Sequence, residues 1–86
     1  MGRLSELLNI SKVTEGKLIE AGIDSPEQLA EMGSREAFIR IRAKDPTACL
    51  HMLYGLEGAV EGIQDKFLSV ETKEALKVFF RSLEQK

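Results

Sequence analysis

Apolar residues recur three and four positions apart along most of this chain, which is the spacing of one face of an α-helix. The clearest apolar stripe lies near the C-terminal end and consists of Leu76, Phe79, Phe80 and Leu83. No segment alternates apolar and polar residues as a half-buried strand does. The pattern therefore predicts an all-α fold.

Capping residues, glycines and prolines divide the chain into six predicted helical segments. Their approximate ranges are 4–8, 14–21, 26–32, 34–44, 46–62 and 70–83, with a connection over 63–68. A single hydrophobic core needs roughly 50 residues or more, and the chain has 86. We therefore expect one compact five- to six-helix domain over residues 1–86.

The best-marked helix start is at Ser25. Serine is a good N-cap, Pro26 suits the first helical position, and Gln28 occupies the glutamine position of a capping box. By similar signals, we expect three later helices to be capped by Ser34, Asp45 and Ser69.

Residues 4–23 have the pattern of a helix-hairpin-helix. DNA-binding hairpins use glycines to expose backbone N–H groups to a phosphate at a helix N-terminus, and here Ser11 and Val13 take the glycine positions. We favour a structural hairpin, because the Val13 side chain limits close approach. The alternative is a phosphate site whose candidate DNA-backbone contacts are Lys12, Thr14 and Lys17.

Three glycines follow one stripe of the helix predicted over 46–62. Gly55, Gly58 and Gly62 would each cost about 1 kcal/mol relative to alanine inside a helix. Close backbone approach would offset this cost. We favour a neighbouring helix of the same chain as the approaching segment, and the alternative is an interface with a second subunit or partner.

Glu57 borders the apolar face of the same predicted helix. A partly buried carboxylate needs a partner, and Arg40 and Arg42 on the preceding helix are the candidates. We therefore expect a buried ion pair rather than an acid–base catalyst.

Net charge and residue types narrow the function classes further. The net charge is −2 and the pI is about 5.4, which disfavours binding of nucleic acid by the whole surface. Cys49 is the only cysteine, so no intrachain disulfide forms, and we expect it in the core of a cytoplasmic protein. We expect no membrane segment, because the longest uncharged run is too short to cross a bilayer.

Catalytic chemistry has little support in the sequence. His51 is the only histidine and has no cysteine, histidine or carboxylate at metal-ligand spacing. No glycine-rich phosphate loop follows a strand. We therefore expect no catalytic residues, metal, cofactor or small-molecule substrate.

Several segments together resemble the C-terminal domain of the TfoX/Sxy family, which is linked to natural competence in bacteria. The most specific stretch runs from Cys49 to Ala59 and is similar to a Cys-Leu-Asn-Leu-Leu-Tyr-Ala-Leu-Glu-Gly-Ala pattern. Shorter matches are Leu8-Asn9-Ile10, Ala21-Gly22-Ile23, Leu29 through Gly33, and Glu36-Ala37-Phe38.

The resemblance implies a stand-alone helical domain of SAM-like or helix-hairpin-helix character. It also implies a regulatory association with DNA transformation and catabolite-activator-dependent transcription. From the placement of the glycines and the net acidity, we expect a non-enzymatic module that acts by protein–protein contact, either by self-association or with a transcription-related partner. The candidate surfaces are the glycine stripe and the exposed side of the last helix, and the alternative is a DNA-backbone-binding domain.

Overall fold

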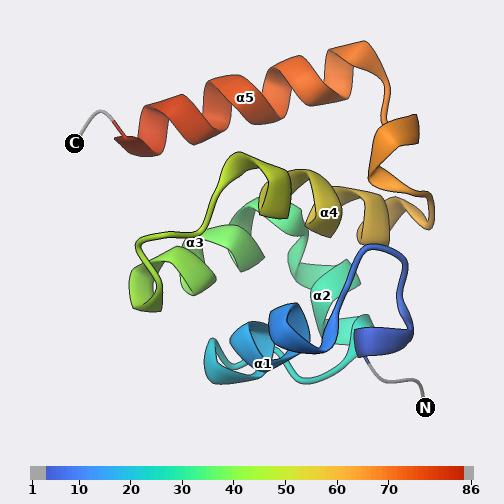
Figure 1. Cartoon of the computed structure of the whole chain (residues 1–86), viewed down its shortest axis with the longest axis vertical. Helices are drawn as coiled ribbons and strands as arrows, with labels where there is room; N and C mark the ends of the chain where they lie inside the picture. The colour runs from blue at the N-terminus through green and yellow to red at the C-terminus, as the bar shows by residue number, and fades with distance from the viewer. Residues whose placement is uncertain (1–3, 85–86) are drawn as a thin grey trace.

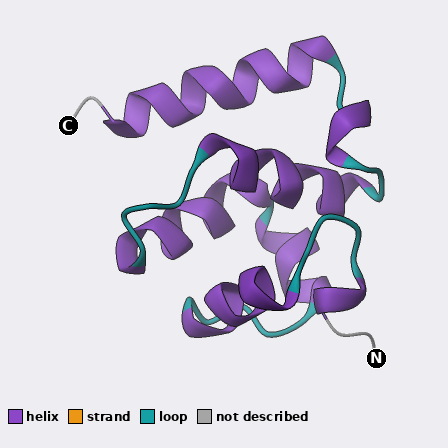
Figure 2. Ribbon diagram, in the orientation of Figure 1, coloured by secondary structure: helices purple, strands orange, loops and turns teal. Residues whose placement is uncertain are grey.

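The structure is a computed structural model of the chain, and residues 4–84 of it are described. Its elements, in order, are η1 (Leu4–Glu6), α1 (Lys12–Glu20), α2 (Pro26–Met32), α3 (Ser34–Lys44), α4 (Leu50–Glu61), η2 (Asp65–Phe67) and α5 (Val70–Glu84). Here η marks a short 3₁₀-helix. Over residues 4–84 every regular element is a helix (Figures 1 and 2). The predicted all-α fold is confirmed.

Helix α4 is the centre of the arrangement. It packs against α3, α5 and η2, and α5 crosses above it as the outermost helix in Figure 1. The core draws its fully buried side chains from every α-helix, with Leu18, Leu29, Phe38, Leu53 and Leu76 as examples. The radius of gyration is 11.9 Å, which matches the value of about 12 Å expected for a compact chain of this length.

Three serines cap helices as local chemistry dictates. Before α5, the Ser69 hydroxyl accepts from the backbone N–H of Thr72 at 3.0 Å, as predicted. The Ser11 hydroxyl accepts from the backbone N–H of Thr14 at 3.2 Å, so α1 begins at Lys12 rather than at Thr14. The Ser25 hydroxyl accepts from the N–H of Gln28 at 3.1 Å, as predicted for a capping box. Each serine satisfies a backbone donor that the first helical turn leaves without a partner.

Three further predictions about the ends and caps of helices differ from the structure. The first segment is a single 3₁₀ turn over Leu4–Glu6, so a helix-hairpin-helix is not confirmed. Helix α4 begins at Leu50 rather than at Pro46, because the Asp45 carboxylate accepts from the N–H and the hydroxyl of Thr47 and holds a turn. Ser34 is the first residue of α3 rather than its cap.

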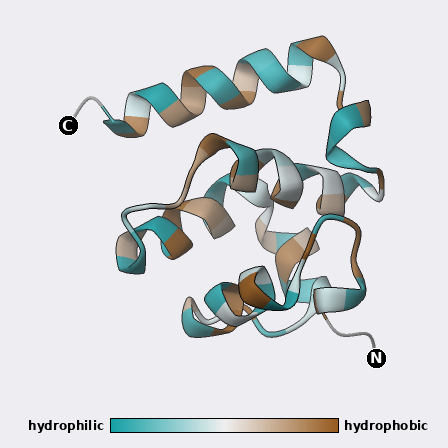
Figure 3. Ribbon diagram, viewed as in Figure 1, coloured by the Kyte–Doolittle hydropathy of each residue, from teal (hydrophilic) through white to brown (hydrophobic). Residues whose placement is uncertain are grey.

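Helix α5 is attached through aromatic side chains. Hydrophobic and hydrophilic residues alternate in short intervals along it in Figure 3, as in an amphipathic helix. The ring of Phe80 lies 5.8 Å from that of Phe38 between centroids. The guanidinium of Arg42 lies 5.2 Å from the Phe80 centroid, and that of Arg35 lies 5.9 Å from the Phe79 centroid. Two cation–π contacts therefore bind α5 to α3.

Candidate functional site

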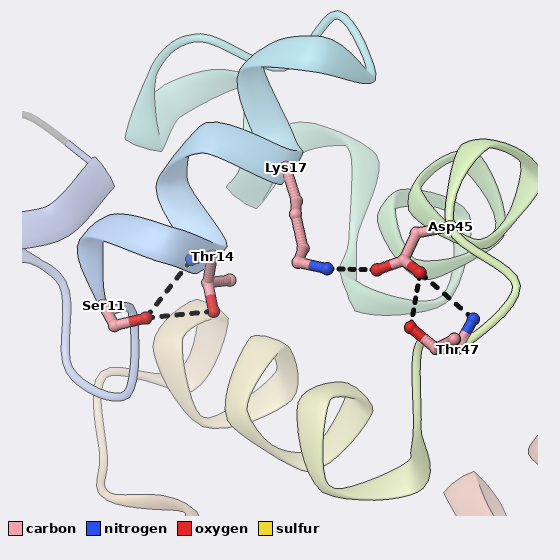
Figure 4. Close-up of polar contacts among 5 residues, drawn as sticks. All are labelled: Ser11, Thr14, Lys17, Asp45 and Thr47. Carbon is pink, nitrogen blue, oxygen red and sulfur yellow. Dashed lines mark hydrogen bonds and ion pairs between the residues drawn. The ribbon is translucent and has the colours of Figure 1, made fainter.

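The predicted DNA-backbone contacts lie around the start of α1, and they differ in whether other residues of the chain already bind their side chains. Lys12 is exposed, and the Thr14 hydroxyl accepts from the Ser11 hydroxyl at 3.3 Å. Lys17 forms an ion pair with Asp45, which lies at the end of α3 (Figure 4). The structure therefore directs Lys17 to a carboxylate of the chain itself.

Thr47 also binds the Asp45 carboxylate that pairs with Lys17. Hydrogen bonds from Lys17, and then from the hydroxyl and N–H of Thr47, lower the pKa of Asp45 to about 2 (Figure 4). The carboxylate is therefore ionised at neutral pH and holds Lys17. A phosphate at α1 would have to compete with Asp45 for this lysine.

The glycines of α4 have three different environments. A Cβ at Gly58 would lie 2.5 Å from Asn9 Nδ2 and 2.8 Å from the carbonyl oxygen of Ile63. At Gly55 the nearest atoms, both of Asn9, would lie 3.5 Å away. Gly62 lies outside the helix as its C-cap, with a φ of 78°, and a Cβ there would have nothing within 4 Å.

The close approach to α4 therefore occurs at Gly58, but the neighbour is not a helix. It is the Asn9 side chain, from the loop before α1, together with the turn that follows α4. Gly58 is buried beneath Asn9 and the turn after α4, so it does not offer a surface to a partner. The favoured prediction of close packing within the chain therefore holds at Gly58, and the alternative of a partner interface is wrong there, because the chain itself fills the space.

Asn9 has a structural role that sequence reasoning missed. Its φ of 70° is in the left-handed region, which asparagine tolerates better than most residues. Its amide nitrogen donates to the carbonyls of Gly55 at 3.4 Å and Ile63 at 3.0 Å, and its amide oxygen accepts from the N–H of Asp65 at 3.1 Å. One side chain thus joins the first loop both to α4 and to the turn that follows it.

The predicted ion pair at Glu57 is wrong. The Glu57 carboxylate instead accepts from the hydroxyl of Ser34 at 2.5 Å, and this serine is only 3% exposed. Glu61 lies one helical turn further along α4. A hydrogen bond with Glu57, followed by desolvation and the Glu57 charge, raises the pKa of Glu61.

The two arginines have other partners nearer to them. Arg40 forms an ion pair with Glu36 at 3.1 Å, one turn earlier on the exposed side of α3. Arg42 stacks on Phe80 of α5. Because Ser34 occupies the opposite end of α3, its hydroxyl, rather than an arginine, meets the Glu57 carboxylate.

A hollow of about 370 Å³ lies at the N-terminal ends of α1 and α4. Its lining residues are Asn9, Ser11, Thr14, Cys49, His51, Met52, Gly55 and Asp65. Cys49 is exposed, contrary to the prediction of a core cysteine, because α4 begins one residue later and leaves Cys49 as its N-cap. No side chain caps the first turn of α4.

A second hollow of about 230 Å³ adjoins the first. It is lined by His51, Tyr54, Asp65, Lys66 and Lys73, so the two hollows share His51 and Asp65. Nε2 of His51 lies 3.7 Å from a carboxylate oxygen of Asp65, and the His51 side chain is 85% exposed. We call the two hollows together the α4 groove.

Metal-ligating and membrane-spanning features are absent from residues 4–84. No three or more histidine, cysteine, aspartate or glutamate side chains of this part of the chain are arranged to hold a metal ion. None of its helices has the length and apolar character needed to cross a bilayer.

Known proteins resemble this chain in both sequence and structure. Protein Sxy of Escherichia coli (strain K12) is 32% identical over 84 residues, which cover 98% of this chain and 40% of Sxy. The chain thus spans less than half the length of this relative.

Two crystal structures of Listeria monocytogenes proteins have the same fold. An uncharacterised protein in a triclinic form is 51% identical, with a TM-score of 0.96 over 96% of this chain and 94% of that chain. A protein of unknown function in a tetragonal form is also 51% identical, with a TM-score of 0.91 over 93% of this chain and 99% of that chain. The TfoX C-terminal domain family matches residues 1–80. The chain therefore belongs to the TfoX C-terminal domain family.

Proposed function

We propose that this chain is a cytoplasmic regulatory module linked to competence and DNA transformation, and that it acts by contact with another protein rather than by catalysis. Membership of the TfoX C-terminal domain family and the similarity to Protein Sxy support the regulatory role. Because the chain corresponds to only 40% of Sxy, the role proposed is that of one module.

The ion pair of Lys17 with Asp45 is the observation that favours a protein partner over the DNA backbone. It engages one of the two predicted phosphate-binding lysines and leaves Lys12 as the exposed one at the start of α1. Affinity for a duplex backbone comes from several neutralised phosphates, and one lysine on a chain of net charge −2 supplies little of it. Apolar side chains, in contrast, are exposed at the end of the molecule that carries η2 and the start of α5.

The experiment that tests this proposal has two parts. Affinity capture of partners from a competent bacterium uses the chain as bait, with and without nuclease treatment of the extract. Titration with a labelled DNA duplex at low and high salt uses the chain and its Lys12→Glu variant.

We expect a specific protein partner that survives nuclease treatment, and no saturable duplex binding at low salt. Duplex binding that falls steeply with salt and is lost in Lys12→Glu would favour the DNA-backbone function instead. The variant Lys44→Glu makes the same charge change on an exposed lysine at the end of α3 and serves as the control.

A further inference from the structure

We propose that the α4 groove binds an acidic segment of a partner protein that also carries an apolar side chain. This inference rests on the proposed function, since it names the surface and the chemistry of a protein contact. Two arguments carry it: the charge of the groups that line the groove, and the exposed apolar side chains at one end.

The lining of the groove is electropositive at both ends. Lys66 and Lys73 line the second hollow, and neither forms an ion pair with any described residue. The uncapped first turn of α4 lies at the first hollow, where its free backbone N–H groups and the helix dipole favour negative charge. Among the described residues, Asp65 is the one carboxylate in the lining of either hollow, and His51 lies next to it.

The acidic residues of α5 do not cancel this charge. Glu74 forms an ion pair with Lys77 at 3.3 Å. Glu71 lies two residues before Lys73, which places it about 160° around the helix from that lysine. Glu71 is exposed and does not line either hollow. Carboxylates of a partner can therefore approach Lys66 and Lys73 without meeting one on α5.

Exposed apolar side chains border the basic end of the groove. Phe67 is 66% exposed and follows Lys66 in the chain, and Val70 is 73% exposed and lies one helical turn before Lys73 on α5. Both lysines line the second hollow. The Lys66 ammonium lies 5.3 Å from the Phe67 ring centroid, so charge and aromatic surface occur together. A partner with carboxylates and an apolar side chain meets both features.

The same features favour a peptide over a nucleic acid. A phosphate backbone carries closely and regularly spaced charges, and it would place some of them against the Asp65 carboxylate in the middle of the groove. An acidic peptide can place a neutral or donor group there. It can also supply the aliphatic or aromatic side chain that Phe67 and Val70 would cover.

The test measures binding of a labelled synthetic peptide in which aspartate and glutamate alternate with leucine and phenylalanine. A second peptide replaces every carboxylate by its amide, and a single-stranded oligonucleotide of equal charge is the third probe. The chain is compared with the double variant Lys66→Glu/Lys73→Glu. The matched control, Lys44→Glu/Arg81→Glu, makes the same charge change at exposed positions outside the groove.

We expect the acidic peptide to bind saturably, and to bind at least about tenfold more weakly to the groove variant, a change of about 1.4 kcal/mol. The control variant should change the affinity by less than about twofold. Phe67→Ser should weaken binding, whereas Val78→Ser, which removes an equally exposed valine further along α5, should not.

Three results would overturn the inference: equal binding to the groove and control variants, equal binding of the amide peptide, or tighter binding of the oligonucleotide. Circular dichroism establishes that each variant is folded. If a nuclease-resistant partner is still captured by Lys66→Glu/Lys73→Glu, the proposed function stands and the groove is not its surface. If the unaltered chain captures no protein partner at all, the proposed function itself is refuted.

Discussion

Substitution of Gly58 by alanine tests the close approach at the centre of the fold. An added Cβ would lie 2.5 Å from Asn9 Nδ2, 2.8 Å from the carbonyl oxygen of Ile63 and 3.3 Å from the Cα of Asp65. The Asn9 side chain could rotate away, but the Ile63 carbonyl belongs to the backbone and cannot. We therefore expect Gly58→Ala to destabilise the chain although alanine is the better helix former.

The magnitude follows from three contributions. Alanine in the helix gains about 1 kcal/mol. Overpacking against a fixed backbone atom costs about 1–3 kcal/mol. Displacement of Asn9 loses hydrogen bonds worth about 1 kcal/mol each. With the two hydrogen bonds of the Asn9 amide nitrogen lost, the sum is a net loss of about 2–4 kcal/mol in the free energy of unfolding.

The assay is urea unfolding followed by far-UV circular dichroism, with two glycines of the same chain as controls. Gly16 is exposed within α1, and a Cβ there would have nothing within 4 Å, so Gly16→Ala should stabilise the chain by about 0.5–1 kcal/mol. Gly55→Ala should lie between the two, because its nearest neighbours would be 3.5 Å away, an ordinary contact. The three variants test one geometric ranking with one chemical change.

Equal or greater stability of Gly58→Ala would refute the reasoning. A separate double-mutant cycle of Gly58→Ala with Asn9→Gly measures how much of the lost stability comes from the Asn9 side chain. Glycine suits this purpose because it keeps the positive φ of that position while removing the side chain. We expect a coupling free energy of about 1 kcal/mol, which is a partial rescue, since the Ile63 carbonyl stays in place.

Three further variants test the polar contacts. The pKa of Asp45 is lowered to about 2, so folding favours its ionised form. This contribution to stability is complete above pH 3.8 and is lost as the pH falls towards 2. The urea midpoint should therefore fall less steeply with decreasing pH in Asp45→Asn than in the unaltered chain. The raised pKa of Glu61 has the opposite effect, because its contribution to stability is present at low pH and is lost as the pH rises. Glu61→Gln should therefore increase the free energy of unfolding at neutral pH by about 0.3 kcal/mol in the same assay. A decrease would contradict the interaction with Glu57 as the cause of the raised pKa. Ser34→Ala removes the donor to Glu57 and should lower the free energy of unfolding by about 1–2 kcal/mol, an effect that Ser34→Thr should largely avoid if the hydrogen bond is responsible.

Local chemistry was readable from the sequence wherever the partners lie within one turn. Ser25, Pro26 and Gln28 mark the start of α2, because the bonds involved span three or four residues. The apolar stripe of α5 was equally plain, since Leu76 is buried and its neighbours on that face are half-buried. These signals were sufficient to predict the helical fold and most of the helix boundaries.

The errors arose where local signals compete with other interactions. Asp45 before Pro46 is a good helix start in isolation, but its carboxylate holds the Thr47 turn and the ion pair with Lys17. Ser34 has the side chain of a cap, but its hydroxyl is taken by Glu57, which is 23 residues away. Neither choice follows from residue types within a few positions, because each depends on which helix packs alongside.

The glycine pattern correctly predicted a close approach to α4, but the predicted neighbour, another helix, was wrong. It indicated a backbone approached too closely for a side chain, which holds at Gly58, but nothing in its spacing identifies Asn9. The local hint was the residue type, because asparagine is one of the few residues that adopt a left-handed conformation in a tight loop. Tolerance of that conformation says that the loop can turn sharply; it does not say what the amide will bind.

The contacts of Asn9 also connect the stability of the fold to the candidate site. Asn9 holds Ile63 and Asp65 against α4, and Asp65 lines both hollows of the α4 groove. A change that displaces Asn9 therefore moves the wall of the groove as well as weakening the fold. Gly58→Ala should then reduce binding of the acidic peptide even where the chain is fully folded, whereas Gly16→Ala should leave binding unchanged. Unchanged affinity in folded Gly58→Ala would mean that the groove keeps its shape without the asparagine, and that this coupling is absent.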